Sequence, residues 1–187
     1  MKTSPPPTTK GGTQTTPMSI VGYSLRAPKC SSVPEFAKAL REGADLTTAR
    51  TRYPSGHLGL FPQQGRIKDS DFATFDPAFF GLSHKQSEAM DPQIRTLLEV
   101  SYESLLDAHI SINDIRGSNT GVYVGHCFSV DASHKTSSFN PNKNGHELVN
   151  GTNSMAANRL RFFYDLKGPV LSLTQHAVPR ESHSIMP

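Results

Sequence analysis

The chain has 187 residues, of which 35% are hydrophobic and 19% charged, and its formal net charge is +3. This length accommodates one domain, and two cysteines exclude a scaffold held by several disulfides. No apolar run approaches the ~18 residues that cross a bilayer, and residues 1–17 lack the apolar run of a secretory signal, so we expect neither membrane spanning nor export. The positive charges form no basic stripe, so we expect a cytoplasmic protein that binds neither membrane nor nucleic acid.

Residues 1–17 contain six threonines and four prolines. Ordering them would cost conformational entropy without the return of a buried apolar surface. We therefore predict a disordered, proline- and threonine-rich arm.

The next segments predict a strand, a helix and a long loop. A short apolar run at 18–23, rich in β-branched residues, is typical of a buried strand. Ser32 and Glu35 then have the spacing of a capping box, and Gly43 can end the helix in the left-handed conformation. Residues 44–81 are punctuated by proline and predict a mostly irregular loop.

The strongest helical pattern follows. Ser83 opens a second capping box, Asp91-Pro92 marks a new helix N-terminus, and apolar residues recur at helical spacing over 94–105. Glu99 and Glu103 lie four residues apart on the opposite face. Two like charges there indicate a solvated or ion-paired surface rather than a catalytic carboxylate pair.

The C-terminal part predicts two further strands. Gly121–Gly125 and Val170–Leu173 are apolar runs typical of buried strands, with a polar loop at 129–150 and a helix at about 153–163 between them. Strands that alternate with helices in this way indicate an α/β fold.

Single motifs carry little chemistry. His126, Cys127 and His134 could be imagined as metal ligands, but their spacing matches no common zinc pattern, and a buried Cys127 is the simpler interpretation. The sequence contains neither a dinucleotide-binding glycine motif nor a phosphate-binding loop.

Several blocks, taken together in chain order, carry a resemblance. They are Ile20–Gly22, Gly65–Asp69, Phe75–Gly81, Met90–Glu103, Arg116–Val122, Ala157–Leu160 and Asp165–Pro169. This succession resembles the start of the β-ketoacyl synthase, or condensing, domain of type I fatty acid and polyketide synthases. The run Gly59–Pro62 with Gly65 is more similar to animal-type fatty acid synthase.

The resemblance implies a thiolase-like α/β fold, of which residues 18–173 would be an incomplete N-terminal half. In the family, the strand corresponding to Val170–Leu173 leads into D-T-A-C-S-S-S, whose cysteine accepts an acyl group. Two later histidines assist decarboxylation of a malonyl thioester. Acyl carrier protein presents both substrates on phosphopantetheine, so no cofactor is expected in this chain. The complete domain is a homodimer, which is doubtful for a half-domain with uncovered strand faces.

Residues 174–187 depart from the family. An ungapped alignment places Ala177 at the nucleophilic cysteine, and the histidine pair would lie beyond residue 187, so we predict no catalytic, cofactor-binding or metal residue. The codons GAC ACA GCA TGC AGT TCC TCG spell D-T-A-C-S-S-S. Without their first base they spell T-Q-H-A-V-P-R, which is residues 174–180. We therefore predict an aberrant, out-of-frame tail, in which His176 is a by-product.

Three smaller expectations concern single residues. His109 stands where the family has the glycine of D-A-G-I. We therefore expect His109 to adopt the left-handed backbone conformation, at a modest local cost in stability. Asn158 and Arg159 are expected to support the active-site region, and Ser172 to be a small packing residue.

Two functions follow from these observations. The first is a fatty acid synthase condensing-domain fragment that is inactive alone, or its polyketide synthase counterpart. The alternative is a non-catalytic interaction module that binds a synthase subunit or a carrier protein.

Overall fold

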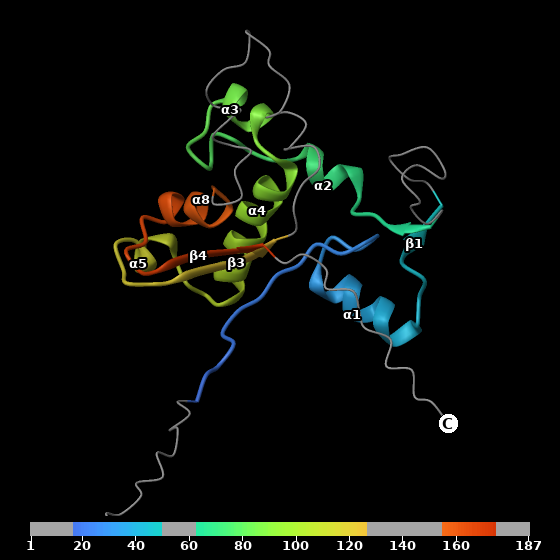
Figure 1. Cartoon of the computed structure of the whole chain (residues 1–187). Coiled ribbons are helices and arrows are strands. Elements are labelled where there is room, and N and C mark those ends of the chain that lie inside the picture. Colours follow the sequence, from blue (N-terminus) through green and yellow to red (C-terminus); the bar gives the residue numbers. More distant parts are fainter. Residues whose placement is uncertain (1–16, 50–62, 127–154, 175–187) are drawn as a thin grey trace, which may run out of the picture.

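The computed structural model describes residues 17–49, 63–126 and 155–174. Helices and short strands alternate within these ranges, as expected of an α/β chain (Figure 1). The helices are α1 (Val33–Glu42), α2 (Asp69–Ala73), α3 (His84–Ala89), α4 (Pro92–Asp107), α5 (Ile112–Ile115) and α8 (Met155–Phe163), and the strands are β1 (Thr47–Thr48), β2 (Gln64–Gly65), β3 (Val122–His126) and β4 (Val170–Thr174).

Local capping signals set the helix boundaries. The Ser32 hydroxyl accepts a hydrogen bond from the Glu35 backbone N–H at 3.5 Å. The Glu35 carboxylate accepts from the N–H of Ser31 at 2.9 Å, so only half of the predicted capping box forms. Gly43 ends α1 with φ of 61°, as predicted, and the capping box of Ser83 before α3 is complete.

Helix α4 supplies the centre of the core. Its residues Ile94 and Leu98 are buried on the predicted apolar face. Helix α8 packs against α4 and buries Ala157 completely. A hydrogen bond of 2.8 Å between the hydroxyls of Ser101 and Tyr164 adds a polar link between α4 and the residue that follows α8.

An aromatic cluster attaches the segment before α3 to these two helices. The rings of Phe75 and Phe80 stack at 5.1 Å between centroids. Phe79 meets Tyr102 of α4 at 4.8 Å, and Phe80 meets Phe163 of α8 at 4.9 Å. The burial of Phe80 and the ring contacts of Phe75 and Phe79 give the loop a fixed place on the core.

The strands form two small sheets. β1 and β2 pair antiparallel, whereas β3 and β4 pair parallel, with Val122 opposite Val170 and His126 opposite Thr174. Parallel neighbours need a crossover connection, and α8 lies within it. The helix packs on both strands, so this unit is the β-helix-β arrangement that the sequence predicts.

The prediction of two buried strands is wrong for one face of the pair. Val122 and Val124 are buried, but Tyr123 is 66% exposed and Leu173 57% exposed. Since side chains alternate between the faces of a strand, α8 covers only the face that carries the valines. No element in the described ranges covers the other face, which agrees with the expectation of uncovered apolar strand faces.

The predicted strand at 18–23 is also wrong. These residues have no regular structure, and Met18, Ile20 and Val21 are exposed. A strand needs a neighbour for its backbone hydrogen bonds, and no described strand lies beside this segment. Its end is fixed instead by the Tyr23 N–H, which donates to an Asp107 carboxylate oxygen at 3.0 Å.

Several predictions fall outside the described residues. They are the arm apart from Pro17, the polar loop at 129–150, and the tail after Thr174. The expected irregular loop at 44–81 is described in part and contains the short elements β1, β2 and α2. Among the described helices, none has the length and hydrophobicity that a bilayer crossing requires.

Candidate functional site

The carboxyl ends of β3 and β4 meet at one edge of the parallel pair. His126 ends β3 and is the register partner of Thr174, which ends β4. In open parallel sheets, ligand sites form outside the carboxyl ends of the strands. This edge is therefore the candidate site. In the sequence, the position at which the resemblance expects a nucleophile follows the end of β4.

His126 and Ser172 approach each other at this edge. The His126 Nε2 and Ser172 Oγ atoms lie 3.0 Å apart, and both residues are half-buried. Ser172 is paired in register with Val124, so His126 reaches it diagonally across the ladder. The imidazole accepts a hydrogen bond from the hydroxyl in one tautomer and donates a hydrogen bond to it in the other. The edge thus combines a hydroxyl with an imidazole at hydrogen-bond distance.

Small residues of α8 support the same face. Ala156, Ala157 and Leu160 are buried, and the helix packs on both strands. Alanine side chains let a helix lie close to a sheet, which fixes the distance between α8 and the strand ends.

Most residues that the sequence analysis considered for catalysis or metal binding lie outside the described ranges. Ala177 and His176 lie there, as do Cys127 and His134 of the alternative metal site. Within the part that the structure describes, no group of three or more His, Cys, Asp or Glu side chains could hold a metal. The described thiol, Cys30, is 4% exposed in an isolated bridge ahead of α1, where it acts as a small apolar residue.

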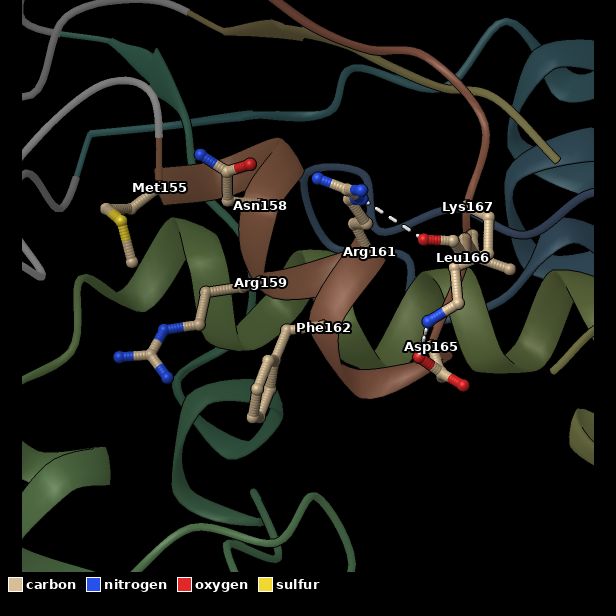
Figure 2. A pocket seen from close by; sticks show the side chains of 8 residues that line it. All are labelled: Met155, Asn158, Arg159, Arg161, Phe162, Asp165, Leu166 and Lys167. Atoms are coloured by element: carbon tan, nitrogen blue, oxygen red, sulfur yellow. Dashed lines mark hydrogen bonds and ion pairs between the residues drawn. The ribbon is translucent and has the colours of Figure 1, made fainter. Parts of the chain in front are cut away.

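Asn158 and Arg159 lie on α8 and line a cavity of about 460 Å³ (Figure 2). Asn158 is exposed, and a supporting role of the two residues at the active site stays a prediction. Ser172, predicted as a packing residue, is half-buried and additionally contacts His126.

The acidic face of α4 is ion-paired, as predicted. Arg26 donates through both terminal nitrogens to the Glu103 carboxylate, and the distance from Nη1 to Oε2 is 2.7 Å. Ser24 Oγ donates to the same carboxylate at 2.5 Å. The hydrogen bond from Arg26 is the main cause that lowers the pKa of Glu103. Partial burial raises the pKa of the neighbouring Glu99. Glu103, together with Asp107, thus attaches the N-terminal segment to α4.

A second cavity, of about 450 Å³, lies between that N-terminal segment, α2 and the start of α4. Its lining is largely apolar and comprises Leu25, Arg26, Ile67, Phe72, Asp91, Pro92, Gln93, Thr96, Leu97 and Val100. The Arg26 guanidinium is already occupied by Glu103, so the cavity offers no uncompensated charge from that residue.

The contact between His126 and Ser172 was not predicted from the sequence, because 46 positions separate the two residues. One signal was available. Both residues occur at the ends of predicted neighbouring strands, and parallel pairing places carboxyl ends at the same edge. The register that brings the two residues together depends on how α8 packs on the two strands. No local sequence pattern specifies that packing.

Comparison with known proteins gives a consistent family. Residues 15–175 match the family model for the N-terminal domain of β-ketoacyl synthase. A fatty acid synthase from Anser anser anser is 39% identical over 155 residues, which cover 82% of this chain and 43% of that relative. The probable polyketide synthase 1 of Dictyostelium discoideum is 32% identical over 163 residues, which cover 83% of this chain and 5% of that relative. The chain therefore spans less than half the length of either relative.

Solved ketosynthases have the same fold. Ketosynthase twelve of the bacillaene polyketide synthase from Bacillus amyloliquefaciens aligns with a TM-score of 0.64 at 28% identity, over 84% of this chain and 27% of that chain. The ketosynthase from module 6 of the bacillaene synthase of Bacillus subtilis 168 aligns with a TM-score of 0.63 at 27% identity, over 83% of this chain and 25% of that chain. These likenesses confirm the thiolase-like α/β class. The chain belongs to the β-ketoacyl synthase family, whose N-terminal domain it matches from residue 15 to the end of β4.

Proposed function

We propose that this sequence derives from the condensing domain of an animal-type fatty acid synthase. The observation that carries the proposal is the match of residues 15–175 to the N-terminal domain of β-ketoacyl synthases. The identity of 39% to the goose fatty acid synthase, against 32% to the Dictyostelium polyketide synthase, supports fatty acid over polyketide synthesis.

The proposed reaction has two steps. A cysteine thiolate after β4 attacks an acyl thioester, so an acyl–cysteine bond forms and the carrier thiol leaves. Loss of CO₂ from a malonyl thioester then leaves a carbanion, which attacks the acyl–cysteine and releases the thiolate. Acyl carrier protein would present both thioesters on phosphopantetheine. The His126–Ser172 pair lies at the carboxyl end of β4, which directly precedes the aligned nucleophile position in the sequence.

We also propose that residues 174–187 are translated out of frame. Ala177 holds the aligned position of the cysteine, and its methyl group cannot form a thioester. The agreement of residues 174–180 with a one-base deletion in the codons of D-T-A-C-S-S-S supports this origin. The chain with this tail is therefore expected to be inactive.

Transcript sequencing across codons 174–187, followed by expression of the reading frame so defined, tests both proposals. We expect a cysteine codon at the aligned position and a product that condenses acetyl and malonyl thioesters with release of CO₂. Independent reads that encode the present tail would contradict the frame proposal. A cysteine-containing product that releases no CO₂ from malonyl thioester would contradict the condensing function.

The proposed location is the cytoplasm. The free thiol of Cys30 suits a compartment that keeps cysteines reduced, and the described helices include no candidate membrane span.

One observation favours a second candidate, a non-catalytic module that binds a synthase subunit or a carrier protein. The face of β3 and β4 that carries Tyr123, Leu171 and Leu173 is exposed in the described chain. Genomic DNA downstream separates the candidates, because a condensing domain requires coding sequence for the histidine pair in another frame.

A further inference from the structure

Helix α8 carries a cavity whose lining includes neither His126 nor Ser172. Its volume is about 460 Å³, and Figure 2 shows side chains from α8 and from the turn that follows it. We define the α8 patch as the charged and aromatic residues at this cavity together with one arginine from the end of α5. The patch comprises Arg116, Arg159, Arg161, Phe162, Asp165 and Lys167.

Cationic side chains outnumber anionic ones in the α8 patch, because Arg116, Arg161 and Lys167 accompany a single carboxylate, that of Asp165. Lys167 Nζ donates to Asp165 Oδ1 at 2.5 Å. Arg161 donates through Nε to the Leu166 carbonyl at 3.1 Å. This bond orients the side chain along the turn and uses one donor of the guanidinium, which has five. Asp165 cannot neutralise these three bases, so the patch attracts anions.

The backbone fixes this arrangement in advance. Asp165 has φ of 52°, in the left-handed region that non-glycine residues rarely occupy. Its carbonyl accepts from the Gly117 N–H at 2.9 Å, and the Lys167 N–H donates to the Ser118 carbonyl at 2.8 Å. Strained residues held by their surroundings are concentrated at functional sites. The turn thus presents Asp165 and Lys167 in a defined geometry before any partner binds.

Phe162 gives the patch an apolar centre. The ring is 82% exposed, although the neighbouring Phe163 packs in the aromatic cluster. Interfaces are enriched in aromatic residues and arginine, and binding energy concentrates on such residues when a pocket covers them. An exposed phenylalanine among arginines therefore indicates a contact surface.

We propose that the α8 patch docks an acidic segment of a partner protein, whose carboxylates pair with the cations while an apolar hollow receives Phe162. Charge complementarity selects this occupant, because guanidinium groups match carboxylates in a bidentate geometry. A nucleic acid fits less well. Asp165 would oppose its closely spaced phosphates, and the cavity offers a single aromatic ring where single strands need several for stacking. The inference does not depend on condensing activity.

Fluorescence anisotropy with the full chain tests the proposal. The probe is a fluorescein-labelled helical peptide with glutamates on one face and leucines on the other, and its counterpart has glutamine at every glutamate. We expect the glutamate peptide to bind and the glutamine peptide to bind at least ~10-fold more weakly, with affinity that falls as salt rises. Equal binding of the two peptides, or no binding of either, would overturn the proposal.

Two variants locate the contact. Lys167→Glu and Phe162→Ser should each weaken binding by ~10-fold, through charge repulsion and loss of the apolar anchor respectively. Lys38→Glu and Leu40→Ser make the same changes at exposed positions of α1, distant from α8 in Figure 1, and should leave affinity within about twofold. Circular dichroism checks that all four variants fold, and Lys167→Gln provides a milder form of the charge change.

The remaining outcomes contradict the proposal. Unchanged affinity in folded Lys167→Glu and Phe162→Ser chains would show that the peptide binds elsewhere. A labelled single-stranded oligonucleotide that binds more tightly than the glutamate peptide, and loses affinity in the same variants, would identify a nucleic-acid surface instead.

Discussion

At the scale of single residues, Arg26 joins the N-terminal segment to the middle of α4. Its guanidinium donates to the Ser31 carbonyl at 2.9 Å as well as to Glu103, and its side chain is 14% exposed. The bidentate pair lets one buried cation satisfy several acceptors, which is the geometry for which arginine is suited. The contact therefore compensates for the strand pairing that residues 18–23 do not make.

Replacement Glu103→Gln should remove this attachment in a pH-dependent manner. We expect it to lower the free energy of unfolding by ~1 kcal/mol at pH 7, less than a fully buried charged hydrogen bond because Glu103 is partly exposed. The folded state lowers the pKa of Glu103 from its ordinary 4.5, so the stabilisation is present above that pH. It is lost as the pH falls through the lowered value. Urea unfolding of both chains from pH 7 to pH 3 should show the difference shrink.

Glu42→Gln provides the matched control for Glu103→Gln. Glu42 forms a solvent-exposed pair with Lys38 at 3.9 Å, so its replacement should change stability by less than ~0.5 kcal/mol at every pH. Burial, the main cause that raises the pKa of Glu99, acts in both chains and cancels from the difference, whereas the repulsion from Glu103 is lost in Glu103→Gln. A difference for Glu103→Gln that does not depend on pH would contradict the role given to its charge.

His109 tests the cost of a left-handed residue at the end of α4. It has φ of 58°, as the resemblance predicts for a glycine position. His109→Gly should raise the unfolding free energy by ~0.5 kcal/mol, because relief of left-handed strain exceeds the backbone entropy of glycine and the loss of the 3.0 Å contact from Nδ1 to the Asp107 carbonyl. Gly43→Ala, at φ of 61° with open space around it, should lower stability by ~1 kcal/mol. Thermal unfolding that shifts both variants in the same direction would contradict this account.

At the scale of elements, α4 depends on its first turn. Asp91 Oδ1 accepts from the Gln93 N–H at 2.7 Å and satisfies a donor that the helix cannot. Asp91→Ala should therefore lower the free energy of unfolding by ~1 kcal/mol, whereas Asp91→Asn keeps the acceptor and should cost only a few tenths. Urea denaturation measures both, and equal losses would show that the negative charge near the helix dipole matters more than the acceptor.

Elements with local signals were predictable from the sequence, and elements that depend on distant partners were not. Ser32, Ser83, Asp91 and Gly43 mark helix ends through contacts within a few residues, and the structure places them where the sequence did. The apolar run at 18–23 has the composition of a strand but no neighbouring strand in the described chain. Likewise, composition alone could not show that α8 covers one face of β3 and leaves the other open.

The candidate site was predictable to a similar extent. The resemblance places β4 directly ahead of the nucleophile position, and the assignment of Ala177 to that position stays a prediction. The 3.0 Å approach of His126 to Ser172 was not predictable, because it requires the register of two strands far apart in the chain. Pattern analysis specifies which strands end near each other but not which side chains meet.

At the scale of the whole molecule, the described elements cover the β3–β4 pair on one side only. Leu171 and Leu173 stand exposed on β4, in line with Tyr123 of β3. Among the described strands, β4 pairs with β3 alone, so no described strand covers its other edge. An exposed apolar strand at a sheet edge promotes association between chains.

Leu173→Lys should therefore reduce self-association of the chain. A charged side chain on an edge strand disfavours strand-to-strand contact between molecules, while an exposed position leaves the unfolding free energy within about 0.5 kcal/mol. Static light scattering over a concentration series should show a lower apparent mass for the variant than for the unmodified chain. Leu40→Lys is the control, because Leu40 is 63% exposed on α1, where no sheet edge is available. If both substitutions reduce scattering equally, added charge explains the effect, and the open face of β4 is not the surface through which the chains associate.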